Sequence, residues 1–205
     1  MLKILSYNLL IISFVLVSCA KKEESSTTTS STTYATSKSG VTASGSITVG
    51  SDTVSGTYAS GCIDASSVTK PSDTTHVGYI IVITGSSTFT KEVNFYTDSA
   101  CTSLSLGWYF NNTSVVVGDA SGSESDYKVA YTQANRTLFA NTTGGKTYIE
   151  NVFAGLDVTV GTASVQTVVV PYYNLIKVSG TNFYIGTESV LAYPSVLSSM
   201  AYVKQ

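Results

Sequence analysis

The side chains that could do chemistry in this chain are few. One histidine and three cysteines stand among its 205 residues. A nucleophilic thiol needs a base beside it, and His76 is the sole imidazole that could serve Cys62 or Cys101 in that way. His76 follows two threonines at the start of a predicted strand, where we expect it to be exposed. The sequence therefore predicts no catalytic residues and no enzyme.

One stretch is rich in the oxygen ligands that calcium prefers. The segment "GDASGSESD" at 118–126 contains Asp119, Glu124 and Asp126. An EF-hand loop needs glycine at its sixth position and a glutamate at its twelfth. Here Gly122 is the fourth residue counted from Asp119, and no distal glutamate follows. We predict a solvated loop, with no metal site and no cofactor.

Cys19 stands at the end of an apolar run that follows Lys3. The tetrapeptide "LVSC" at 16–19 resembles the bacterial lipobox, which directs lipid attachment and cleavage at its cysteine. The resemblance implies that Cys19 carries diacylglyceryl and N-acyl groups. An uncleaved membrane span is the alternative, but the 15 residues 4–18 are fewer than the ~20 that a span requires.

Residues 1–18 are then a signal peptide that is removed. Nine consecutive Ser/Thr residues occupy 25–33, and such a stretch has little apolar surface to offset the entropy of ordering. We therefore predict a disordered tether over 19–45 and a folded domain over 46–205. Two or more acyl chains give stable membrane attachment, which predicts a location in the bacterial envelope. The pair Ala20-Lys21 lacks the aspartate of an inner-membrane retention signal, which favours the outer membrane.

Cys62 and Cys101 remain as an even pair in an oxidising compartment. We predict a disulfide between them, with two free thiols as the alternative. The bridge would close a loop of 40 residues, 62 through 101, worth about 4 kcal/mol in the chain-entropy model. Asp98 precedes Cys101 by three residues, and we expect its carboxylate to cap the turn that presents this cysteine.

Composition excludes one class of partner. Charged residues make up 12% of the chain, and the formal net charge is −2. Without a basic patch there is little to bind a phosphate backbone, so we expect no nucleic-acid partner. Fourteen tyrosines, with Ser, Thr, Val and Gly throughout, are typical of an exported β protein.

Short β runs fill the predicted domain. The run "STFTKEVNFYT" places Phe89, Val93 and Phe95 on one face and Glu92 on the other, which favours a solvated Glu92. In "RTLFANTTGGKTYIENVF", the pair Gly144-Gly145 predicts a hairpin turn between two strands. The best helical candidate is "PSVLSSMAYV" at 194–203.

The class we predict is all-β. Eight to ten antiparallel strands in one domain must close into a barrel or stack as a β-sandwich, since an open sheet would leave long edges. The stretches "GTYASGCI" and "NFYTDSACTS" resemble the Gly-aromatic-x-x-x-Cys and Tyr-x-Asp-x-x-Cys-Thr segments of small lipocalin-like bacterial lipoproteins. The C-terminal "NFYIGTESVLAYPSVLSSMAYVKQ" is similar to their closing segment, although Tyr58 stands where a tryptophan is more usual. The resemblance covers most of 53–205 and implies a single antiparallel calycin-type barrel of unassigned activity.

Two groups of rings are the candidates for a binding site. They are Trp108, Tyr109 and Phe110 in one run and Tyr172 with Tyr173 in another. Consecutive strand residues face opposite sides, so each group places a ring in the core and another outside or at a rim. Core packing is one interpretation, and rings that line the mouth of a pocket are the other.

Two functions follow from these patterns. In the first, a non-enzymatic lipoprotein displays its barrel, with loops such as 118–126, to an envelope or host protein. In the second, a lipocalin-like carrier holds a small apolar ligand inside the barrel. A filled interior would contradict the second function, whereas a cavity of ~300 Å³ or more would support it.

Overall fold

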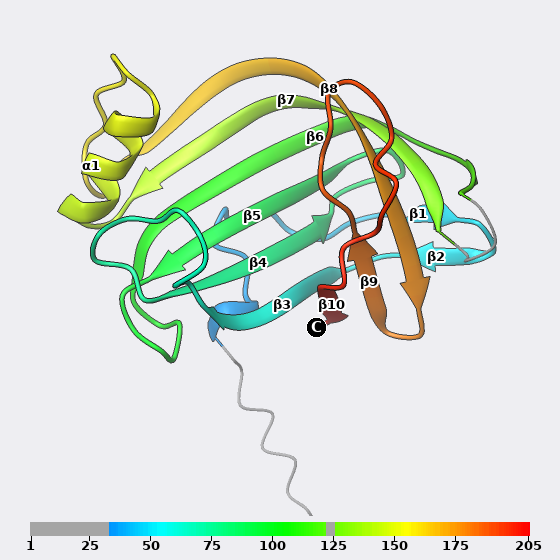
Figure 1. Cartoon of the computed structure of the whole chain (residues 1–205), viewed down its shortest axis with the longest axis horizontal. Helices are drawn as coiled ribbons and strands as arrows, with labels where there is room; N and C mark the ends of the chain where they lie inside the picture. The colour runs from blue at the N-terminus through cyan, green and yellow to red at the C-terminus, as the bar shows by residue number, and fades with distance from the viewer. Residues whose placement is uncertain (1–32, 122–125) are drawn as a thin grey trace, which may run out of the picture. The chain divides into compact units, whose positions relative to one another are not determined.

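A computed structural model describes residues 33–121 and 126–205 (Figure 1). The predicted signal peptide, Cys19 and the first part of the predicted tether lie outside these residues, as does Glu124. In the part of the chain that the structure describes, no helix has the length and apolarity needed to cross a membrane.

Eight antiparallel strands close into a barrel, in the order β10-β3-β4-β5-β6-β7-β8-β9. The strands of the barrel are β3 (Thr57–Asp64), β4 (His76–Ile83), β5 (Phe89–Tyr96), β6 (Leu104–Ala120), β7 (Tyr127–Ala140), β8 (Ala163–Ser179), β9 (Asn182–Ile185) and β10 (Ala201–Lys204). Two short strands, β1 (Ile47–Val49) and β2 (Asp52–Val54), form a separate hairpin. The predicted all-β barrel is confirmed, and the β-sandwich alternative is wrong because β10 pairs with both β9 and β3.

The barrel interior holds two apolar clusters, one at each end. One includes residues of the β1–β2 hairpin and the other includes Ile149 of the helix α1 (Thr143–Val152). Figure 1 shows these two elements at opposite ends of the barrel. The hairpin-side cluster consists of Ile47, Val49, Val54, Tyr58, Ile81, Ile83, Phe89, Val129, Tyr131, Ile176, Phe183, Ile185 and Tyr202. The helix-side cluster consists of Ala65, Val77, Phe95, Leu106, Leu138, Ala140, Ile149 and Val158. Both draw alternate residues from the strands, as the period of two requires.

The predicted hairpin at Gly144-Gly145 is wrong, because these residues begin the helix α1 (Thr143–Val152). Thr142 caps this helix, and its hydroxyl accepts a hydrogen bond from the Gly145 N–H at 3.0 Å. The glycines serve close packing: a Cβ on Gly144 would lie 2.4 Å from the Asp73 carboxyl carbon, and one on Gly145 would lie 2.5 Å from the Ser105 carbonyl oxygen.

The predicted helix over 194–203 is also absent from the described residues. Residues 194–200 are irregular, and the strand β10 follows from Ala201. This strand closes the barrel by pairing on both its edges, so tertiary pairing outweighs the short apolar period of about two helical turns.

The folded unit begins earlier than predicted. Residues 33–43, which we name the strap, lie on the outer face of β3 and β4, with the 3₁₀ turn η1 (Thr33–Ala35) at their start. Ala35 packs with Ala59, Ile80 and Val82, and Val41 and Ala43 pack against the same group. Just after the strap, the Ser44 N–H donates to the Ile83 carbonyl at 2.8 Å. The Ser/Thr-rich composition conceals these few small apolar residues, so the prediction of a tether extending to 45 is wrong for 33–45.

Candidate functional site

A row of polar and aromatic side chains crosses the barrel interior between the two apolar clusters. Lys91 on β5 lies opposite Phe110 on β6, Phe110 lies opposite Arg136 on β7, and Arg136 lies opposite Gln166 on β8. Cross-strand neighbours point to the same face of a sheet. Lys91 alternates with Phe89 and with Val93, which pack in the interior clusters, so the whole row faces inward.

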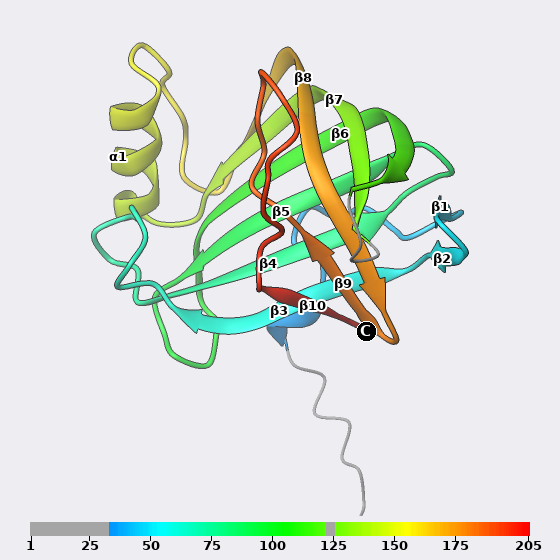
Figure 2. The same ribbon diagram turned by 45° about the vertical axis from the view of Figure 1, so that its right-hand side comes forward.

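An ion pair lies at one end of this row. The Lys91 ammonium is 2.9 Å from a carboxylate oxygen of Glu188, and the Tyr131 hydroxyl donates to the same oxygen at 2.8 Å. Burial, followed by the negative charge of Glu188, raises the pKa of Tyr131 well above its ordinary value, so the phenol keeps the proton that it donates. Glu188 comes from the irregular segment 186–200, which rises from β9 beside β8 and returns to β10 (Figure 2).

Aromatic rings surround the cation at the other end of the row. The Arg136 guanidinium carbon lies 3.9 Å from the centroid of the Phe153 ring, and its Nε donates to the Gln166 amide oxygen at 2.7 Å. Phe153 meets Trp108 edge to face at 5.3 Å, and Trp108 meets Phe110 at 5.4 Å between ring centroids. Burial lowers the pKa of Arg136, and this effect is larger than the opposite effect of the nearby Tyr172. The guanidinium still stays charged at neutral pH.

We name these interior residues the luminal cluster. It consists of Lys91, Trp108, Phe110, Tyr131, Arg136, Phe153, Gln166, Tyr172 and Glu188. Several of its members keep contact with solvent although they point inward: Lys91 and Glu188 are 18% and 27% exposed, and Trp108, Phe110 and Tyr172 are half-buried. Solvent therefore reaches a cationic, aromatic part of the interior.

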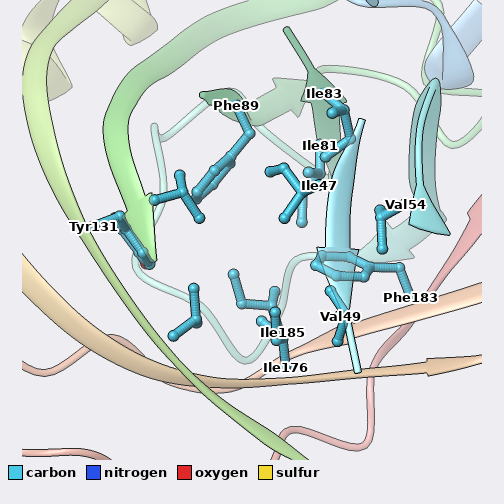
Figure 3. A pocket seen from close by; sticks show the side chains of 12 residues that line it. Ile47, Val49, Val54, Ile81, Ile83, Phe89, Tyr131, Ile176, Phe183 and Ile185 are labelled. Carbon is cyan, nitrogen blue, oxygen red and sulfur yellow. The ribbon is translucent and has the colours of Figure 1, made fainter. Parts of the chain in front are cut away.

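The hairpin-side end of the interior is filled. Apolar side chains converge there from the hairpin and the barrel strands (Figure 3), and the cavity between them measures about 20 Å³. That volume accommodates about one water molecule and is far below the ~300 Å³ of a small-molecule site. This end leaves no room for an apolar ligand.

The second notable feature is a buried carboxylate under the strap. Glu92 points outward from the barrel, on the side that alternation predicts, but it is fully buried. Its oxygens accept hydrogen bonds from the hydroxyls of Ser37 and Ser39 at 2.5 Å each, the N–H groups of Lys38 at 2.8 Å and Ser39 at 3.3 Å, and the Asn94 amide at 3.1 Å. The prediction of a solvated Glu92 is therefore wrong, because the strap covers it and supplies four of the five donors.

The sequence-predicted rings divide between the two faces. Trp108, Phe110 and Tyr172 belong to the luminal cluster. Tyr109 points outward and is buried, with its hydroxyl against Gly107. Tyr173 also points outward, and its ring meets Tyr193 at 5.1 Å. The structure therefore brings three of the five predicted ligand-binding residues together and separates the other two from them.

Sequence reasoning missed the charged members of the luminal cluster. Lys91 lies between Phe89 and Val93 at even spacing, so a lysine on the inward face could have been recognised from alternation. Glu188 carried no such signal, because it lies in an irregular segment. Glu150, predicted on a strand, lies on α1, where it pairs with Lys146 at 2.5 Å.

The remaining predictions concern His76 and the acidic loop at 118–126. His76 begins β4 and its ring nitrogen lies 3.0 Å from the Thr75 hydroxyl. Among residues 33–121 and 126–205, no group of three or more His, Cys, Asp and Glu side chains is placed to hold a metal ion. Asp126 of the acidic loop lies 3.6 Å from the Lys177 ammonium.

The predicted disulfide is present between Cys62 and Cys101, with 6.0 Å between their Cα atoms. The Asp98 carboxylate caps the adjacent turn, as predicted, by accepting hydrogen bonds from the N–H groups of Ala100, Thr102 and Ser103. Burial alone would raise the pKa of Asp98, but the hydrogen bonds from Ser103 and Thr102 lower it from 3.8 to about 2. The charged form of Asp98 therefore stabilises the turn that holds Cys101.

A pH-dependent loss of stability follows from this turn. Asp98→Asn should lower the free energy of unfolding at pH 6 by about 1 kcal/mol, a modest value because the group is near solvent. A folded-state pKa below the unfolded one gives stability that is present above pH ~4 and lost as the pH falls through ~2. Urea unfolding should therefore show a gap between wild type and variant that closes towards pH 2. A gap independent of pH would contradict this account, and Asp52→Asn, at an exposed position, is the control.

No protein-family model and no curated protein matches this chain.

Proposed function

We propose that this protein is a lipoprotein of the bacterial envelope, anchored by lipid in the outer membrane, and that it displays its barrel to an envelope or host protein without catalysis. The lipobox resemblance at 16–19 supports the anchor. The filled hairpin-side interior supports display over the carriage of an apolar ligand, because the largest apolar part of the barrel holds only its own side chains.

The strap is the observation that carries this proposal. Through Glu92 it fixes residues 37–39 on the outer face of the barrel. The chain that leads back to Cys19 therefore leaves the barrel from a fixed position. Thirteen residues, 20 through 32, separate Cys19 from Thr33 and span at most about 45 Å when fully extended. A lipid at Cys19 would then hold a defined side of the barrel within that distance of the membrane.

The intact mass of the protein purified from bacterial membranes tests the anchor. Wild type should lack residues 1–18 and carry the added mass of acyl groups on Cys19. Ser18→Ala, which keeps a small residue before the cysteine, should match it. Cys19→Ser should keep residues 1–18 and gain no acyl mass. An unmodified Cys19 in wild type would overturn the proposal.

The luminal cluster supports a second function, a carrier of a small amphipathic ligand. The two cations Lys91 and Arg136 outnumber the one carboxylate of the cluster, Glu188, which pairs with Lys91. They stand beside half-buried rings, an arrangement that suits an anionic head on a flat or apolar body. Such a ligand would enter the solvent-reached part of the interior and leave the filled end unchanged.

The chain offers a built-in reporter for this second function, because Trp108 is its single tryptophan and lies in the luminal cluster. Titration with anilinonaphthalene sulfonate or decanoate should change Trp108 fluorescence. Arg136→Gln should weaken binding about tenfold through loss of a charge-assisted hydrogen bond. Lys128→Gln, at a lysine over the ring of Tyr193 outside the barrel, should bind as wild type does. Equal affinities for both variants would exclude the luminal site.

A further inference from the structure

One edge of β8 is unpaired over half its length. The strand pairs with β7 from Ala163 to Ile176, but it pairs with β9 only from Ile176 to Ser179. A single further bridge joins Tyr173 to Ser189, where the 186–200 segment leaves the strand. Among the described residues, none pairs with the other edge of β8 over 163–172, and this part of the strand arches between α1 and β9 (Figure 1).

This edge lacks the charged side chains that most often protect one. Its proline, Pro171, lies beyond residues 164–170, and the register of β8 against β7 shifts between Thr167 and Val170. Native edges carry charged side chains or strong twists that discourage a second strand, yet residues 163–173 contain no charged side chain. Val165 and Val169 point outward and are 66% and 71% exposed. Leu191, where the neighbouring segment leaves the strand, is 89% exposed. The main chain and the apolar side chains are therefore both available to a partner strand.

The residues along this edge are complementary to themselves. The outward-facing series is Val165, Thr167 and Val169, which reads the same in both directions. In an antiparallel pair with its two-fold axis at Thr167, each Val165 would face the Val169 of a second copy, and the two Thr167 residues would face each other. Valine pairs and threonine pairs stabilise cross-strand contacts, and no like charges meet.

We propose that two copies of this chain associate through residues 164–170 of β8, antiparallel about Thr167. The geometry is isologous, as in most homodimers, and it uses the strand-addition mode of recognition. One short edge and a few valines form a small interface, so the dimer should be weak in dilute solution, with a Kd of about 10 μM or above. Confinement of both copies to one membrane would raise their effective concentration. The inference does not depend on the proposed function.

Single cysteines test both the contact and its register in the full-length protein. Thr167→Cys should form a dimer through a disulfide under mild oxidation, since directly opposed strand residues have the Cα separation that a disulfide needs. Val165→Cys alone should not, because the two-fold axis places its copies ~14 Å apart. A mixture of Val165→Cys and Val169→Cys should again cross-link, about tenfold more than Val165→Cys alone.

Sedimentation velocity provides a second measurement. Wild type should show a concentration-dependent dimer that the double variant Val165→Lys with Val169→Lys abolishes, because lysines would then face each other. Val196→Lys, equally exposed at 73% but away from the edge, should leave the dimer unchanged. A monomer at all concentrations, equal cross-linking of all three cysteine variants, or a cross-link from Thr167→Cys to a protein of another mass would overturn the proposal.

Discussion

Replacing Glu92 with alanine is expected to detach the strap and to lower the free energy of unfolding by about 2–3 kcal/mol. The carboxylate accepts five hydrogen bonds, four of them from Ser37, Lys38 and Ser39. Hydrogen bonds to a charged acceptor contribute about 1.5–3 kcal/mol each where their donors stay buried. Here the strap can lift and its donors can return to water, so the net loss is smaller than the sum.

Trypsin cleavage within the strap can measure its detachment. Lys38 is the single trypsin site within 33–43, and its N–H is bound to Glu92 at 2.8 Å. Trypsin should cleave slowly after Lys38 in wild type and rapidly in Glu92→Ala. Urea unfolding followed by Trp108 fluorescence should give the loss of stability.

A matched control separates the strap from a general effect of losing a carboxylate. Glu150→Ala removes a glutamate that pairs with Lys146 at the surface of α1, and such pairs contribute about 0.5 kcal/mol or less. It should leave cleavage after Lys38 slow. Protection of Lys38 in Glu92→Ala equal to that in wild type would show that the apolar contacts of Ala35 and Val41 hold the strap without the carboxylate.

Glu92 also shows how far a sequence can predict a site of this kind. The alternation of Phe89, Val93 and Phe95 gives the correct side for Glu92, because the period of two is a property of the strand itself. Burial on that side depends on a distant segment, and no local pattern in the strand reports it. The strap in turn is read as a tether, since its small apolar residues stand among serines and threonines.

The barrel was predictable for a similar physical reason. Many short alternating runs in one domain leave few ways to bury one face and remove the sheet edges, and closure is one of them. The luminal cluster was predictable only in part. Trp108 and Phe110 share a face by alternation, and Lys91 could have been added to them. Glu188 could not, because its position depends on the path of an irregular segment.

The local sequence gave its clearest wrong prediction at the helix α1. Gly144 and Gly145 have high intrinsic freedom and predict a turn. In the structure their small size matters more than their freedom, since Asp73 and the Ser105 carbonyl occupy the space that a Cβ would need. A pair of glycines thus predicts either a turn or a close contact, and the contact is visible only in three dimensions.

Loss of the Cys62–Cys101 disulfide is expected to have the largest effect on stability of any change considered. The double variant Cys62→Ala with Cys101→Ala should lower the free energy of unfolding by about 4 kcal/mol, because the bridge restricts a 40-residue loop (62 through 101) in the unfolded chain. A domain of this size should then unfold about 8–16 °C lower. Thermal unfolding measured by Trp108 fluorescence tests this.

The position of the bridge indicates how the loss should be distributed. The disulfide joins β3 to the turn between β5 and β6, where Cys101 is fully buried and has a φ of 53°, a left-handed backbone conformation that is costly outside glycine. Asp98 supports that turn independently of the bridge, so Asp98→Asn in the double variant should add its own ~1 kcal/mol at pH 6 if the turn persists without the bridge. No added loss would mean that the turn is formed only when the disulfide is present. Reduction of wild type should reproduce the double variant, and an unchanged melting temperature after reduction would contradict the prediction.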